Sequence, residues 1–285
     1  MYNKYLILIL SFFSLIIILP FIGIFSKLNF DFYSLLVFIN NTYILKIIYF
    51  TFYQAFFSAV LSCLIAIPFA LALNRHKNLK IIRYLVSICG FSFVIPSILI
   101  VYAVIKLFGI NGFYNNYFNF YELFGINSVY GLKAILIAHI LLNAPFATRL
   151  FFQNLDNIPN KYYEISSSLN LTFFGNIIKL EIPIIKQNLF SVFSIIFSLC
   201  FLSFAIVMVL GGSPLNSTIE VAIYQFALFE LNFNKAIFLS FIQIFICSIF
   251  IFIGFNKMKG SKYFEINNTI YTHPYKNYKF IKLID

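Results

Sequence analysis

Long apolar runs constrain this sequence more than any other feature. A helix needs about 20 apolar residues to cross roughly 30 Å of hydrocarbon at about 1.5 Å per residue. Six runs of about that length occur, at Tyr5–Phe25, Ile47–Leu73, Tyr84–Phe108, Leu132–Phe152, Leu189–Leu210 and Ala236–Phe255. The sequence therefore predicts an all-α polytopic membrane protein with six transmembrane helices.

Composition agrees with this assignment. The chain of 285 residues is 61% hydrophobic and 10% charged, whereas soluble domains are roughly a quarter charged. The first run is longer than the apolar part of a cleavable signal peptide, so we expect a membrane span there. The four cysteines lie inside runs without metal-ligand or redox spacing, which predicts packing roles and no metal site.

Basic residues set the expected orientation, because positively charged loops stay cytoplasmic. With the N-terminus inside, Lys and Arg favour the inner segments by three to one. Both termini are thus predicted to be cytoplasmic, and anionic membrane lipid accounts for the net charge of +11 without nucleic-acid binding. We expect one transmembrane domain over residues 1–285, with a core at about 43–255, a cytoplasmic loop at about 153–188 and a tail at 256–285.

The loop at 153–188 has organised polar and apolar residues. Its apolar residues recur at the three- and four-residue steps of one helical face: Leu155, Ile158, Tyr162, Ile165 and Leu169. The spacing predicts a short amphipathic helix that starts near Pro159 and ends near Asn170, a residue type that tolerates the left-handed conformation. A second helical piece is expected over 172–180, before Pro183. Such a helix either lies on the membrane or enters the groove of a cytoplasmic partner.

The stretch EISSSLNLTFFGNIIKLEIP, residues 164–183, resembles the cytoplasmic loop of permease subunits of binding-protein-dependent ABC importers, within the MetI-like superfamily. The family pattern is E-A-A, three residues, G, nine residues, I, one residue, L, P, and the register is kept without a gap. Asn170 stands where the family has Gly, and Ile165 and Ser166 replace the alanines. The resemblance implies that this helix couples to an ATPase through these residues: Tyr162, Glu164, Ile165, Ser166, Leu169, Asn170 and Pro183.

Two further stretches, Ile135–Pro159 and Leu199–Gln225, resemble the N-terminal half of thiamine transport permeases. This resemblance implies a bacterial inner-membrane location and import of thiamine or its phosphates. The implied partners are a cytoplasmic ABC ATPase dimer, a periplasmic substrate-binding protein and a second permease half. That second half is an identical chain or a separate homologous one, or the gene is truncated. The chain contains no G-x-x-x-x-G-K-[ST] phosphate loop, so we expect a permease that is not itself an enzyme, has no cofactor and relies on ATP bound by its partner.

Polar residues inside the apolar runs are the candidates for a substrate pathway, because burying them in lipid is costly. His139 and Asn143 lie four residues apart and share one helical face. Gln54 and Ser203 lie in the second and fifth runs. These four residues either line the pathway or join helices through hydrogen bonds.

Other functions remain open at this stage. A permease of the same superfamily for ferric iron or a polyamine differs from a thiamine permease only in the resemblance at Leu199–Gln225. An intramembrane enzyme would need a catalytic set, and no HExxH or GxSxG motif occurs, so no catalytic residue is predicted. A proton- or sodium-coupled carrier normally has an acidic residue within the membrane, whereas the nine acidic residues here lie at the ends of runs or in loops.

Overall fold

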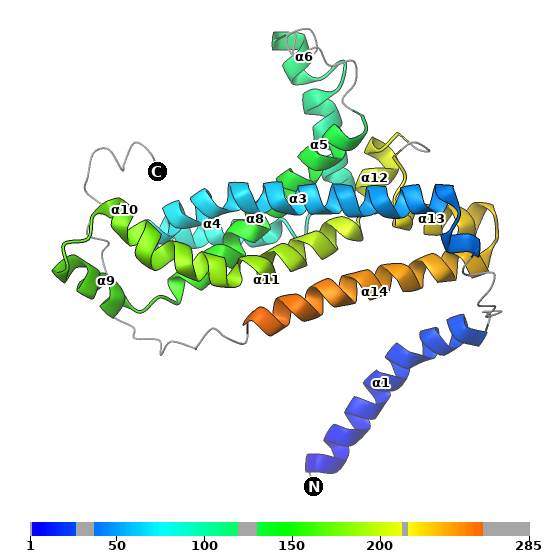
Figure 1. Cartoon of the computed structure of the whole chain (residues 1–285), viewed down its shortest axis with the longest axis horizontal. Coiled ribbons are helices and arrows are strands. Elements are labelled where there is room, and N and C mark those ends of the chain that lie inside the picture. Colours follow the sequence, from blue (N-terminus) through cyan, green and yellow to red (C-terminus); the bar gives the residue numbers. More distant parts are fainter. Residues whose placement is uncertain (1, 27–36, 119–129, 213–215, 259–285) are drawn as a thin grey trace.

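The computed structural model describes residues 2–26, 37–118, 130–212 and 216–258, and all regular elements within these ranges are helices (Figure 1). The cytoplasmic tail predicted at 256–285 falls almost wholly outside the described residues. The helices are α1 (Tyr2–Ser26), α3 (Thr42–Arg75), α4 (Lys80–Phe91), α5 (Ser97–Phe108), α6 (Phe113–Phe118), α8 (Leu132–Asp156), α9 (Asn160–Ser168), α10 (Phe173–Asn176), the π-helix η1 (Ile177–Glu181), α11 (Ile182–Phe201), α12 (Ala205–Leu210), α13 (Ile219–Tyr224), the π-helix η2 (Gln225–Phe229) and α14 (Phe233–Met258).

Four long helices form the body of the protein. α3 packs along α8 and α11, and α11 also packs along α14 (Figure 1). Fully buried alanines on α3, at Ala55, Ala59, Ala66 and Ala70, let its neighbours approach closely, as small residues do between helices in membranes. Gly254 on α14 has the same role against α11, because a Cβ there would lie 3.0 Å from the Cβ of Ser194.

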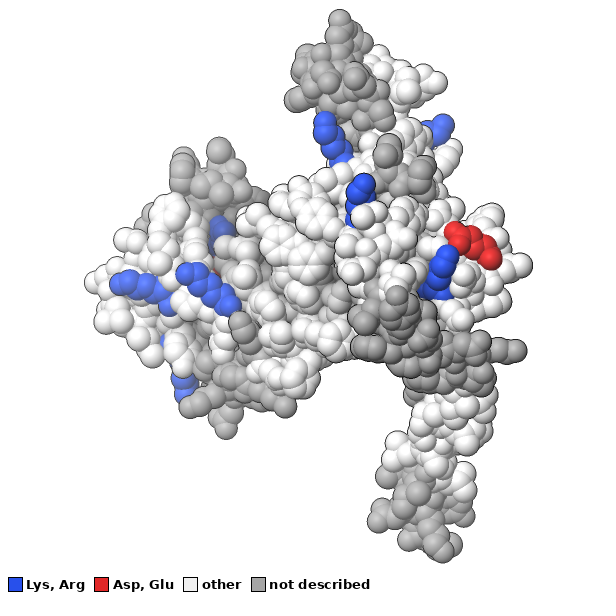
Figure 2. Space-filling view, turned by 45° about the vertical axis from the view of Figure 1, so that its right-hand side comes forward, with Lys and Arg blue, Asp and Glu red and all other residues white. Residues whose placement is uncertain are grey.

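The all-α membrane fold predicted from the sequence is confirmed. Five helical segments are long and apolar enough to cross a membrane: Thr42–Arg75, Ser97–Tyr117, Leu132–Asp156, Phe173–Phe201 and Phe233–Asn256. The first predicted span corresponds to α1, a helix of 25 residues that lies apart from the bundle in Figure 1. Between the ends of the bundle, the visible surface in Figure 2 is almost entirely uncharged, as contact with lipid requires.

Two predicted spans are not continuous helices, and this corrects the sequence assignment. The run predicted as Tyr84–Phe108 is divided into α4 and α5 by a break over residues 92–96. Pro96 explains this break, because its ring disfavours a helical conformation at the preceding residue. The run predicted as Leu189–Leu210 is divided into α11 and α12 over residues 202–204, where the sequence has no proline or glycine to signal a break.

The loops predicted to face the same side of the membrane lie at the same end of the bundle. At one end, which we call the α9 end, Lys77 after α3 forms a 3.1 Å ion pair with Asp156 at the end of α8. At the other end, the Ile219 amide donates to Thr51 Oγ1 at 3.0 Å, near the start of α3. The polar loop at 153–188 and the basic turn after α3 therefore share one end.

Candidate coupling surface and transmembrane cavity

Helix α9 is the amphipathic helix predicted from residue spacing, but of the five residues predicted on one apolar face only Tyr162, Ile165 and Leu169 are exposed. Leu155 belongs to α8 and Ile158 precedes α9, and both are buried in the core. Pro159 precedes its first residue, and Asn170 ends it with a φ of 50°. The Leu171 amide donates to the Ser166 carbonyl at 3.1 Å and the Asn170 amide donates to the Ser167 carbonyl at 3.0 Å, which is the pair of bonds that defines a Schellman motif. The left-handed conformation predicted for Asn170 is confirmed, and Asn fits there because it adopts positive φ more readily than most residues.

The outward face of α9 carries an apolar stripe. Tyr162, Ile165 and Leu169 are 44%, 57% and 68% exposed. Glu164 is also exposed beside them. An exposed apolar stripe on a short helix is the surface that a partner's groove recognises, so the position of these side chains fits a docking surface.

Ser166 does not belong to this outward face. Its side chain is buried, and its hydroxyl donates to the Tyr163 carbonyl at 2.8 Å. Ser166 therefore lies on the inner face of α9 together with Tyr163, one turn earlier. The resemblance to the family loop placed it with the docking residues, because the family pattern has a small residue at that position.

The chain after α9 returns to the bundle without a long loop. Thr172 begins α10 by accepting a 3.2 Å hydrogen bond from the Gly175 amide. The π-helix η1 follows and continues directly into α11. Pro183 lies exposed in the first turn of α11, as predicted, at the junction where η1 passes into α11.

A cavity of about 430 Å³ lies beside α8. Both breaks in the predicted spans contribute to its wall, Ser92 and Phe93 from the first and Ser203 and Phe204 from the second. Irregular backbone at membrane depth is tolerated where it is buried in protein or lines a cavity. The two interruptions in the helices and the cavity are thus parts of one structural feature.

Three of the four predicted pathway residues meet at this cavity, namely His139, Asn143 and Ser203. His139 Nδ1 lies 2.9 Å from Ser58 Oγ, whereas its buried Nε2 has no hydrogen-bond partner among the described residues. Gln54 lies outside the cavity wall, and its Nε2 donates to the Cys200 carbonyl at 3.0 Å between α3 and α11.

Side chains on the cavity wall have a definite chemical character. Among the described residues that line it there is no Asp, Glu, Lys or Arg. Hydrogen-bonding groups come from serines, His139 and Asn143, and aromatic rings come from Phe93, Phe146 and Phe204. The Phe93 and Phe146 rings lie 5.5 Å apart between centroids. Such a wall suits a small molecule that offers an aromatic ring and hydrogen-bonding atoms.

Solved structures with a similar fold are ABC importers. A bacterial ABC transporter that imports the acidic polysaccharide alginate has a chain that matches 92% of this protein and 96% of that chain, with a TM-score of 0.69 and 15% identity. The alginate transporter in complex with its alginate-bound periplasmic protein matches 89% of this protein and 92% of that chain, with a TM-score of 0.66 and 16% identity. The protein therefore shares the fold of these transporter chains.

Proteins with similar sequences are transport permeases. The thiamine transport permease ThiP of Haemophilus influenzae is 35% identical over 210 residues, which are 74% of this chain and 39% of that protein. ThiP of Escherichia coli is 33% identical over 211 residues, 73% of this chain and 39% of that protein. A probable sulfate transport permease, cysT of Helicosporidium sp. subsp. Simulium jonesii, is 25% identical over 87% of this chain and 91% of its own length. No family model matches the chain.

The chain thus shares the fold of these ABC importer chains. In sequence it is related to the thiamine transport permeases over about three-quarters of its length. The chain spans about two-fifths of the length of the ThiP relatives that it matches.

Proposed function

We propose that this chain is a transmembrane permease subunit of an ABC importer for thiamine or its phosphates. In this proposal a periplasmic binding protein delivers the substrate, and the permease passes it to the cytoplasm. ATP is bound and hydrolysed by separate ATPase subunits, so the permease itself is not an enzyme. The observation that carries the proposal is the relationship to ThiP over 74% of the chain.

The coupling surface of the proposed importer is the outward face of α9. α9 lies at one end of the bundle (Figure 1), and this end faces the cytoplasm in the orientation that the basic residues favour. The ATPase supplies a groove for this face, and Glu164 and Asn170 border the contact. Binding there removes three large apolar side chains from water, which favours association.

The cavity beside α8 is the proposed substrate pathway. Thiamine carries a positive charge and an aromatic ring, and the Phe93 and Phe146 rings can hold such a cation by cation–π contact. His139 Nε2 and Asn143 supply hydrogen bonds. A second permease half, either an identical chain or a homologous one, completes the pathway.

Uptake in cells tests this function. The chain is expressed with its ATPase and binding protein in a bacterial host that cannot take up thiamine, and uptake of labelled thiamine, ferric iron, a polyamine and sulfate is compared. The proposal expects uptake of thiamine that requires all the subunits. Uptake of another member of this panel in place of thiamine refutes the cargo, and uptake that does not require the ATPase refutes the class of transporter.

A further inference from the structure

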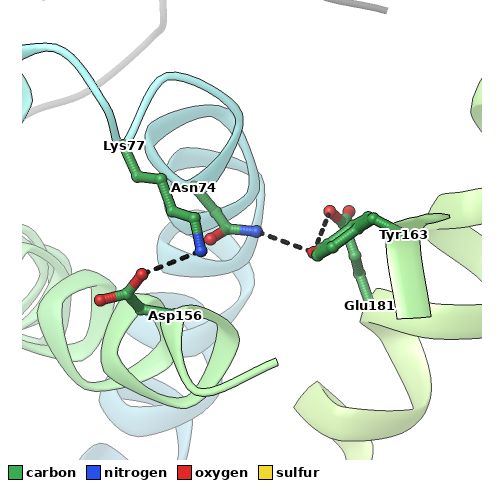
Figure 3. Close-up of polar contacts among 5 residues, drawn as sticks. All are labelled: Asn74, Lys77, Asp156, Tyr163 and Glu181. Carbon is green, nitrogen blue, oxygen red and sulfur yellow. Dashed lines mark hydrogen bonds and ion pairs between the residues drawn. The ribbon is translucent and has the colours of Figure 1, made fainter. Parts of the chain in front are cut away.

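A buried chain of hydrogen bonds joins α9 to two other elements at the α9 end of the bundle (Figure 3). Asn74 Nδ2, in the last turn of α3, donates to the Tyr163 hydroxyl at 3.2 Å. The Tyr163 hydroxyl donates to Glu181 Oε1, in η1, at 3.3 Å. Tyr163 thus links α9 to both α3 and η1.

Burial makes these contacts costly to lose. Tyr163 and Glu181 are each 1% exposed and Asn74 is 4% exposed. A buried polar group that loses its partner costs far more free energy than an exposed one. The neighbouring ion pair between Lys77 and Asp156 has a carboxylate side chain that is 52% exposed, so it contributes little by comparison.

Glu181 occupies an unusual position. It is the last residue of the π-helix η1, and π turns are rare and occur often at functional sites. In the pattern of the family loop, Glu181 is the single unspecified residue between two apolar positions. Its carboxyl group therefore belongs to a contact that the loop pattern does not specify.

We propose that Tyr163 is a positioning residue that transmits the movement of α9 to the two helices that it contacts through Asn74 and Glu181. This inference rests on the proposed function, in which the ATPase moves α9. A packed helix moves as a body and not by continuous deformation. A displacement of Tyr163 therefore moves the end of α3 and the start of the α11 segment together.

Both helices lead from Tyr163 to the cavity. α3 continues from Asn74 to Ser58, which contacts His139 in the cavity wall, and this distance is about 24 Å along the helix. η1 and α11 continue from Glu181 to Leu199, another wall residue, over about 27 Å. The hydroxyl of Tyr163 thus connects the surface that meets the ATPase with two sides of the cavity.

The test measures how many thiamine molecules are transported for each ATP hydrolysed. A residue that only stabilises the fold would leave this ratio unchanged when it is replaced. Tyr163→Phe keeps the ring and removes the hydroxyl, and the complete transporter is reconstituted with its ATPase and binding protein in vesicles. We expect the number of thiamine molecules carried per ATP hydrolysed to fall about tenfold, the scale of a buried polar group that loses its partner, while the ATPase still binds α9. Tyr84→Phe, at an exposed tyrosine on α4, is the matched control and keeps the ratio.

Several results would overturn the inference. An unchanged transport-to-ATP ratio in Tyr163→Phe, even with less protein in the membrane, shows a structural role only. Because Asn74 and Tyr163 act in series, the double variant with Asn74→Ala should show no lower ratio than the more impaired single variant. If the double variant lowers the transport-to-ATP ratio by the product of the two single effects, Asn74 and Tyr163 do not act in series. Absence of ATP-dependent transport in the unmodified protein overturns the proposed function as well, so the two failures are distinguishable.

Discussion

A charge placed on the outward face of α9 should separate the permease from its ATPase without unfolding it. Full burial of an isoleucine side chain contributes about 1.5–3 kcal/mol, and Ile165 is 57% exposed, so docking contributes about 1–2 kcal/mol at this residue. In Ile165→Asp this contribution is lost, and an unpaired carboxylate must also enter the contact. Together these effects amount to about 3 kcal/mol or more, which is a loss of at least about 100-fold in affinity.

The assay is binding of the purified ATPase to the permease in detergent, with the thermal unfolding midpoint of the permease recorded in parallel. Ile165→Asp should weaken binding and leave the midpoint within a few degrees of the unmodified protein, because the side chain makes few contacts within the chain. Ile165→Leu keeps an apolar side chain of the same size, so it should bind normally. Normal ATPase binding by Ile165→Asp would refute the docking surface, and a large fall in the midpoint would refute the claim that this side chain is free of the core.

Three further predictions concern α9 and the cavity. Ser167→Pro should break α9, since proline removes an amide and clashes with the preceding turn; the protein should still insert in the membrane but lose ATP-dependent uptake, and uptake that survives contradicts coupling through a helix. Asn170→Val should lower the free energy of unfolding by about 1–2 kcal/mol, because a β-branched residue is strained at positive φ. Asn170→Gly should not lower it. Equal thermal unfolding midpoints for the two variants would count against the Schellman motif at the end of α9. His139→Ala should reduce thiamine uptake about tenfold while ATPase binding is kept, since it removes an imidazole from the cavity wall; unchanged uptake would show that substrate does not pass His139.

Features that depend on local residue patterns were predicted well. The length and apolar character of the runs identified the membrane helices, because crossing a bilayer imposes both properties on a continuous stretch. The three- and four-residue spacing that ends at Asn170 identified α9 and its left-handed ending. Each of these features depends on residues that lie within a single helix or next to it in the sequence.

Features that depend on contacts between distant segments were not predictable. The break at residues 202–204 has no local signal, and only the cavity that it borders gives it a structural context. Tyr163 was passed over because periodicity singled out its neighbour Tyr162 on the apolar face. Its hydroxyl contacts Asn74 from 89 residues away, and no pattern within α9 announces such a partner. Gln54 was grouped with the pathway residues because its polarity alone does not tell a cavity wall from a contact between helices.

ATP-dependent transport in a defined system tests the central claim most directly. The permease, its second half, the ATPase and the binding protein are reconstituted in vesicles that contain labelled thiamine only on the binding-protein side. We predict accumulation across the membrane that requires ATP and both soluble partners and persists without any proton or sodium gradient. Accumulation that follows an ion gradient in the absence of ATP would contradict the assignment of this chain as an ABC importer permease.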